Sequence, residues 1–89
     1  MIQCKPELDI KLSSGYKVLL LNDEFNDMDH VVVSLNKVFG FNDAQCINIM
    51  VEAHNTGAAL CITTTEDEAI LYSEQLLTFG LGSSIDNGD

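Results

Sequence analysis

The chain contains one strongly β-rich run, Tyr16-Lys17-Val18-Leu19-Leu20-Leu21, which ends at the polar pair Asn22-Asp23. A short apolar run that stops at turn residues predicts a buried strand. The polar segment 22–27 predicts a loop, and Asp27 is a suitable N-cap for a helix that Gly40 ends. Apolar residues of this helix recur at helical spacing: Met28, Val31, Val32, Leu35, Val38 and Phe39.

A second helix follows at Asn42-Asp43-Ala44-Gln45, which has the pattern of a capping box with Asn in place of Ser or Thr. Asn55-Thr56-Gly57 is expected to end this helix, because Asn and Gly are typical residues after a helix C-terminus. The apolar run 58–64 then predicts a second strand.

A third helix is predicted from a second capping box, Thr65-Glu66-Asp67-Glu68, to Gly80. Residues 81–85 predict a short last strand. The element order is therefore β-α-α-β-α-β. We expect an α+β sandwich in which a three-stranded, mainly antiparallel sheet packs on three helices.

The chain is short enough for a single domain, and we place that domain at residues 16–86. Residues 1–15 are polar, with Pro6 and then Ser13-Ser14-Gly15, and are expected to be a flexible N-terminal extension. Residues 87–89 are expected to be a fraying tail.

Charge limits the partners. Fourteen acidic residues face four lysines and no arginine, so the net charge is −10. Nucleic-acid binding needs a basic surface, and anionic membranes are disfavoured for the same reason. A basic partner surface or a cationic ligand group fits this charge. The acidity could also serve solubility alone, and the sequence leaves both explanations open.

The three cysteines, Cys4, Cys46 and Cys61, have neither an even count nor CxxC spacing, which argues against a disulfide framework and a zinc site. Cys46 and Cys61 fall in apolar runs and are predicted to be reduced core residues. The N-terminus lacks a signal-peptide pattern, and no apolar run approaches the length of a membrane span. We therefore expect a cytoplasmic, reducing compartment and no cofactor.

The acidic residues after the first strand do not fit a calcium loop. An EF-hand counted from Asp23 needs Gly at its sixth position and Glu at its twelfth, where this chain has Met28 and Ser34. No G-x-S-x-G motif occurs, and no local motif places a Cys beside a His. No metal site and no catalytic residue is predicted.

Four other residues deserve a separate interpretation. His30 lies early in the first helix and is read as a surface residue. His54 lies in the last turn of the second helix, where we expect a half-buried proton donor. Met28 and Met50 stand at core positions of their helices. They fit either simple packing or the adaptable wall of a pocket.

In order and spacing, four motifs resemble the ClpS family, the N-degron adaptors of Clp AAA+ proteases. They are the segments 16–23, 28–31 and 50–57, and Gly80-Leu81 before the last strand. The resemblance covers roughly residues 16–86. The sequence Glu52-Ala53-His54-Asn55 is most similar to the cyanobacterial and chloroplast branch of the family. It implies a bacterial or organellar origin, or a phage-borne copy.

The resemblance implies an adaptor without enzymatic activity. Such an adaptor would bind the free α-amine and the bulky first residue (Phe, Tyr, Trp or Leu) of N-degron substrates and deliver them to a Clp unfoldase. By resemblance, the amine is bound by Asn22, Asp23, Glu24 and His54. The hydrophobic pocket corresponds to Asn26, Met28, Val31, Met50, Ala53 and Leu81.

Three of these residues depart from the common family pattern. Glu24 replaces an Asp, Asn26 replaces a Thr, and Ala53 replaces a Val. The smaller Ala53 is expected to widen the pocket, which would either shift selectivity toward larger side chains or make it looser.

The implied partner is the N-terminal domain of a ClpA- or ClpC-type AAA+ unfoldase, bound by a monomer of this chain. Asp67 and Tyr72 are candidates for docking on it. Two other functions remain open at this point. One is a regulator that docks on the unfoldase without binding N-degrons, and the other is a small hydrolase that uses His54.

Overall fold

A computed structural model describes residues 15–87 of the chain and confirms the predicted α+β class and element order. The elements are β1 (Tyr16–Leu21), α2 (Met28–Phe39), α3 (Asp43–Thr56), β2 (Ala58–Thr64), α4 (Glu66–Thr78) and β3 (Ser83–Asn87). The predicted N-terminal extension lies outside the described residues except for Gly15, as do Gly88 and Asp89 of the predicted tail.

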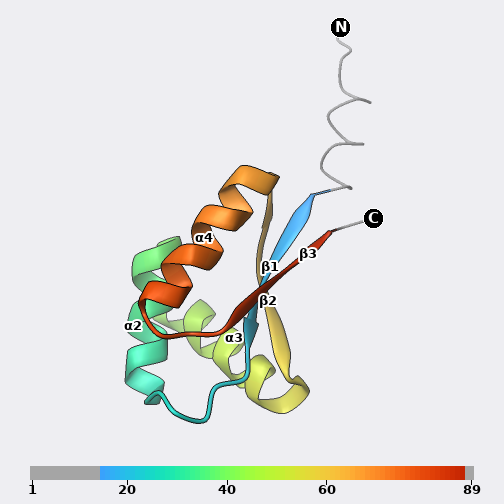
Figure 1. The fold of residues 1–89 in the computed structure, drawn as a ribbon. Coiled ribbons are helices and arrows are strands. Elements are labelled where there is room, and N and C mark those ends of the chain that lie inside the picture. The colour runs from blue at the N-terminus through green and yellow to red at the C-terminus, as the bar shows by residue number, and fades with distance from the viewer. Residues whose placement is uncertain (1–14, 88–89) are drawn as a thin grey trace, which may run out of the picture.

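The sheet has the strand order β2-β1-β3, and both pairings of β1 are antiparallel. The first strand of the domain is therefore the central one, and the helices lie to one side of the sheet (Figure 1). Val18 and Leu20 of β1 point to the helices and are buried, as expected from the period of two in a strand. The pairing with β2 shifts between Val18 and Leu19, which marks a bulge or irregularity.

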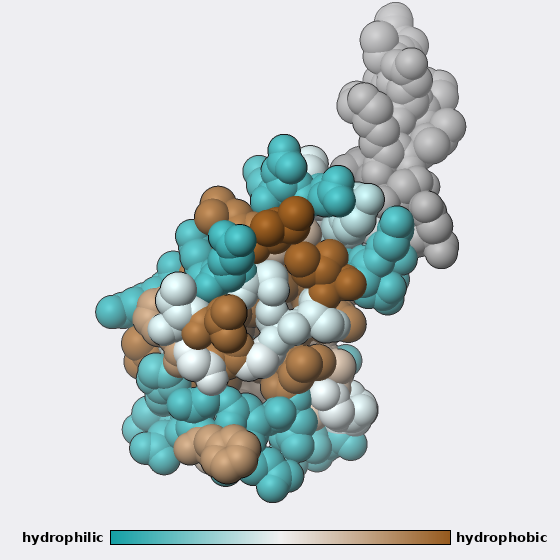
Figure 2. Space-filling model, in the orientation of Figure 1, coloured by the Kyte–Doolittle hydropathy of each residue, from teal (hydrophilic) through white to brown (hydrophobic). Residues whose placement is uncertain are grey.

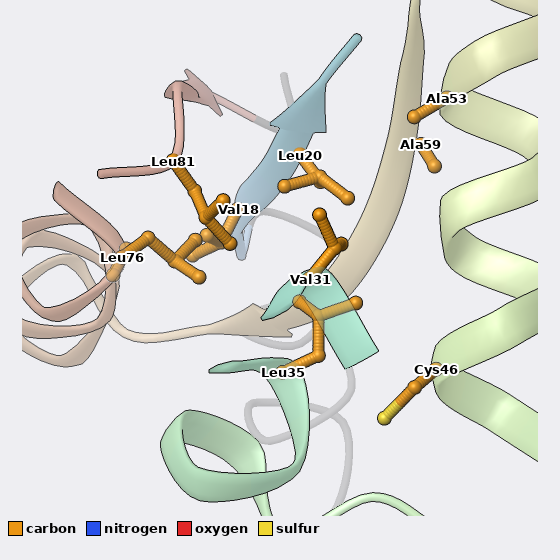
Figure 3. Close-up of a cluster of buried hydrophobic side chains, with 10 residues drawn as sticks. Val18, Leu20, Val31, Leu35, Cys46, Ala53, Ala59, Leu76 and Leu81 are labelled. Carbon is orange, nitrogen blue, oxygen red and sulfur yellow. The ribbon is translucent and has the colours of Figure 1, made fainter. Parts of the chain in front are cut away.

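Side chains from the sheet and from all three helices meet in one core (Figure 3). Its buried members are Val18, Leu20, Val31, Leu35, Cys46, Ala53, Ala59, Ala69, Leu76 and Leu81. The hydrophobic effect stabilises such a cluster by about 25 cal/mol for each Å² of apolar surface removed from water. The core fixes how β1, α2 and α3 sit relative to one another, which matters for the site below.

The capping box predicted at α3 is confirmed in both directions. The Asn42 side chain accepts from Gln45 N, and the Gln45 side chain accepts from Asn42 N. At α4 the Thr65 side chain accepts from Glu68 N, but the Glu68 carboxylate accepts from the Thr64 hydroxyl instead of completing the box. Asp27 is the N-cap of α2 without a side-chain hydrogen bond to that helix.

The last strand begins two residues later than predicted, at Ser83, and extends to Asn87, where the tail was expected to begin. The cause is the end of α4. Gly80 has φ +81°, its N–H donates to Leu77 O, and the Leu81 N–H donates to Leu76 O. These two bonds form a Schellman motif, which holds Leu81 against the helix end and in the core, away from the sheet ladder.

None of the helices in residues 15–87 combines the length and the apolar character needed to cross a membrane.

Candidate functional site

A cavity of about 510 Å³ opens where β1 ends, between the loop after β1, the start of α2 and the second half of α3. Its lining residues are Leu20, Leu21, Asn22, Asp23, Glu24, Asn26, Met28, Val31, Met50, Val51, Ala53 and His54. The structure thus brings together all the residues predicted to bind an amine and all the predicted pocket residues except Leu81. A volume of this size is typical of small-ligand sites.

One end of the cavity is apolar. Leu20, Val31 and Ala53 are almost fully buried members of the core, so the part of each that meets the cavity is backed by close packing. Met28, 67% exposed in the first turn of α2, and the half-buried Met50 of α3 add flexible thioether side chains to the wall. This end can take up an apolar side chain of irregular shape.

The other end is polar, and two backbone hydrogen bonds assemble it. The Leu21 N–H donates to Gly82 O at 3.1 Å, and the Asn22 N–H donates to Gly57 O at 3.0 Å. Gly57 is the C-cap of α3, so the second bond joins the end of β1 to the helix end that includes His54. Residues 22 and 54 are therefore neighbours across the cavity although they are distant in sequence.

The Asn22 side chain donates through Nδ2 to Glu24 Oε2 at 3.4 Å. This bond uses the amide nitrogen, so Oδ1 is the atom of Asn22 that can accept from a ligand. With the Glu24 carboxylate, it presents acceptor oxygens to a cationic group.

Asp23 organises the loop. Its Oδ1 accepts from Phe25 N at 2.7 Å and from Asn26 N at 3.1 Å, and its Oδ2 accepts from Asn26 Nδ2. Asn26 Nδ2 also donates to Gly80 O at 3.0 Å, which ties this loop to the end of α4. These hydrogen bonds, first that of the Asn26 side chain, lower the pKa of the Asp23 carboxyl against a smaller opposing effect of burial.

We expect Asp23→Ala to lower the melting temperature at pH 7 and to matter progressively less in acid. The native state favours the ionised carboxylate, so its contribution is present above the ordinary Asp pKa of about 3.9. It is lost as the pH falls through the lowered pKa of the folded state. The measurement is the melting temperature of both proteins from pH 7 to pH 2. An undiminished difference at pH 2 would show that ionisation of Asp23 does not stabilise the loop.

His54 lines the cavity but is exposed, so the expectation of a half-buried side chain was wrong. The buried face of α3 is formed by Cys46 and Ala53. His54 follows Ala53 directly, and successive residues of a helix point about 100° apart, which turns the imidazole from the core toward the cavity rim. There it can exchange hydrogen bonds with a ligand and with water.

His30 is exposed, as the sequence suggested, but it also has a tertiary contact. Its Nε2 lies 2.7 Å from the carbonyl oxygen of Phe79, at the C-cap of α4. Together with the bond from Asn26 to Gly80, it joins the start of α2 to the end of α4.

The remaining predicted residues lie elsewhere. Leu81 is 1% exposed in the core, and its place in a pocket wall stays a prediction. Asp67 is exposed in the first turn of α4. Tyr72 is half-buried with its ring 4.8 Å from that of Phe39, so much of its surface is already used for packing.

Sequence reasoning missed three residues that line the cavity: Leu20, Leu21 and Val51. The leucines end the β-rich run directly before the polar loop, and this adjacency could have placed them at the site. Val51 follows Met50 on α3, and nothing in its position distinguishes it from other apolar helix residues.

Within residues 15–87, no group of three or more His, Cys, Asp or Glu residues is arranged to hold a metal ion. Burial raises the pKa of the Cys46 thiol, and it raises that of the half-buried Cys61 to about 12. Both thiols are therefore protonated at neutral pH and poor nucleophiles.

Comparisons with known proteins all point to the same family. The model of a family described as "ATP-dependent Clp protease adaptor protein ClpS" matches residues 11–83. The chain is 43% identical over 88 residues to the ATP-dependent Clp protease adapter protein ClpS of Synechococcus elongatus, which covers 96% of this chain and 93% of that protein. It is 41% identical to the ClpS of Synechococcus sp. strain CC9902, over 94% of this chain and 82% of that protein.

A solved structure of Agrobacterium tumefaciens ClpS2 bound to L-phenylalaninamide matches the fold with a TM-score of 0.80. Its sequence identity to this chain is 26%, and the match covers 84% of this chain and 98% of that one.

Proposed function

Because the chain belongs to the ClpS family of adaptors of the ATP-dependent Clp protease, we propose that its cavity binds the first residue of N-degron substrates for delivery to a Clp unfoldase. Membership confirms the resemblance seen in the motifs and makes the protein an adaptor, not an enzyme.

The observation that supports this proposal best is the division of the cavity into an apolar end and an acidic, hydrogen-bonding end. An N-terminal residue with a bulky apolar side chain has matching parts, because its side chain and its α-ammonium group leave the same Cα atom. L-phenylalaninamide, the ligand of the Agrobacterium relative, has a free α-amine and a benzyl group in this arrangement.

At the polar end, the ammonium group would donate to Asn22 Oδ1 and the Glu24 carboxylate, with His54 as a third partner. An α-amine has a reference pKa of about 7.7–8.0, so it is mostly charged at neutral pH. Each hydrogen bond that involves a charged group is worth about 1.5–3 kcal/mol. The C-terminal end of α3, next to Asn22 through Gly57 O, adds the negative end of a helix dipole.

At the apolar end, burial of a Phe or Leu side chain contributes about 1.5–3 kcal/mol. Together with the amine contacts, this burial is consistent with a dissociation constant of about a micromolar or lower. A micromolar dissociation constant corresponds to a binding free energy of about −8 kcal/mol. The proposed preference is for Phe, Tyr, Trp and Leu at the first position.

Labelled peptides that begin with Phe, Leu and Val test the pocket by fluorescence anisotropy. We expect Phe and Leu peptides to bind at low micromolar concentration and the Val peptide more weakly, since a smaller side chain buries less apolar area.

Met28→Ala should weaken binding of the Phe peptide several-fold, because Met28 is open to a ligand in the cavity wall.

Val33→Ala is the matched control, since Val33 is 48% exposed on the same helix and does not line the cavity. It should leave binding unchanged. Equal binding of all three peptides, or equal effects of the two variants, would count against a pocket for the first side chain.

The delivery step needs contact with the unfoldase, which we propose to be the N-terminal domain of a ClpA- or ClpC-type partner. The exposed carboxylate of Asp67 on α4 is available for it without competing with the cavity, to which α4 contributes no side chain.

A further inference from the structure

Phe25 is 97% exposed, although it is a large aromatic residue in a loop that is otherwise polar. The lower end of the molecule in Figure 2, where this loop lies in Figure 1, is mostly hydrophilic. The backbone that presents the ring is well fixed. Phe25 N donates to Asp23 Oδ1, and the next residue, Asn26, is bonded to both Asp23 and Gly80 O. An aromatic side chain on a loop held by such hydrogen bonds is a preorganised contact for a ligand.

A second, open hollow of about 420 Å³ lies beside Phe25. Three of its lining residues, Asn22, Asp23 and Glu24, also line the first cavity, and Gly80 and Gly82 complete it with Phe25. The two hollows therefore share Asn22 and Glu24, two of the three residues to which the proposed function assigns the substrate α-amine.

Gly82 is not demanded by the fold. It does not have a positive φ, and a Cβ atom there would lie 3.6 Å from the Leu21 side chain, an ordinary contact. Gly80, in contrast, needs its φ of +81° to end α4. Position 82 therefore contributes only backbone to the lining of the hollow, which leaves room for a peptide.

We propose that this hollow binds the second residue of the substrate, and that Phe25 selects long cationic side chains, Arg or Lys, at that position. The inference rests on the proposed function. With the α-amine at Asn22 and Glu24, the second Cα lies only about 3.8 Å from the first, so the second side chain is within reach of the second hollow.

The chemistry of the hollow favours a cation. The aliphatic stem of Arg or Lys can pack against the Phe25 ring while its charge interacts with the ring face. The carboxylates of Asp23 and Glu24 lie in the same lining and attract the same charge. An acidic second residue meets repulsion from both.

The test uses two peptides of equal composition and charge, Phe-Arg-Ala-Ala and Phe-Ala-Ala-Arg, each with a labelled C-terminal extension. The two peptides carry the same charge, so the general attraction exerted by the protein's net charge of −10 is the same for both. We expect wild type to bind the peptide with Arg second about three- to five-fold more tightly. Phe25→Ala and Gly82→Ala should bring the ratio close to one without weakening the peptide with Arg fourth. Leu77→Ala, which removes a 70%-exposed side chain outside both hollows, should leave the ratio unchanged.

Equal affinities for the two peptides in wild type would overturn the second subsite while leaving the proposed function intact. The same conclusion follows if the ratio survives in Phe25→Ala. Failure of both peptides to bind would instead remove the proposed function, and this inference with it.

Discussion

Acetylation of the substrate α-amine is expected to weaken binding by about a hundredfold or more. Acetylation removes the positive charge and two of the N–H donors, so the hydrogen bonds to Asn22 Oδ1 and Glu24 are lost or become neutral. The loss of about 3 kcal/mol, at 1.36 kcal/mol per tenfold change, corresponds to a factor of more than a hundred. The acetyl group also has to fit beside His54, at the polar end of the cavity. Anisotropy titrations of a Phe peptide and its N-acetyl form measure the ratio directly.

Two variants separate the amine contacts from general charge. Asn22→Ala removes an acceptor without a change of charge, while His54→Ala removes the imidazole at the rim. Both should weaken the free peptide and have little effect on the acetylated one, so the ratio between the peptides should shrink. If the acetylated peptide bound wild type as tightly as the free peptide, the polar end of the cavity would have no part in recognition.

Leu76→Ala is expected to lower the free energy of unfolding by about 2–5 kcal/mol. Leu76 is fully buried in the core, where Leu81 is also a member, and its carbonyl oxygen accepts the Leu81 N–H. Because domains have only about 0.05–0.15 kcal/mol of stability per residue, this single change would remove a large part of the total. Urea unfolding followed by circular dichroism measures the difference.

Leu77→Ala is the matched control, the same substitution one residue further along α4. Leu77 is exposed, so its loss should change stability by no more than about 0.5 kcal/mol. Similar midpoints for the two variants would mean that the packing at the end of α4 adds little to the fold.

Much of the fold could be predicted because local chemistry sets it. The Asn42 and Gln45 side chains determine where α3 begins, and glycines end α2 and α3 with positive φ at positions 40 and 57. The start of β3 could not be predicted in the same way. It depends on whether the N–H of Leu81 bonds to the end of α4 or to β1, and only the tertiary arrangement decides between them.

The site shows the same division. Asn22 and His54 could be assigned through family motifs, and the structure places both on one cavity. The sequence could not show that the Asp23 carboxylate accepts hydrogen bonds from the loop backbone, because these bonds depend on the turn geometry of residues 23–26. It also did not single out Phe25, although an aromatic residue between Glu24 and Asn26 in a polar loop was visible from the start.

The central position of β1 has a consequence for biosynthesis. β1 leaves the ribosome first, yet one of its edges pairs with β3, the last element of the domain. The backbone N–H and C=O groups on that edge of β1 therefore stay unpaired until the C-terminal strand has been released. Contacts of such high sequence separation slow folding, since loop closure has to precede them. The adaptor can complete its sheet only once residues 83–87 have been synthesised. A chain that stalls before residue 83 leaves one edge of β1, the strand that ends at the cavity, unpaired.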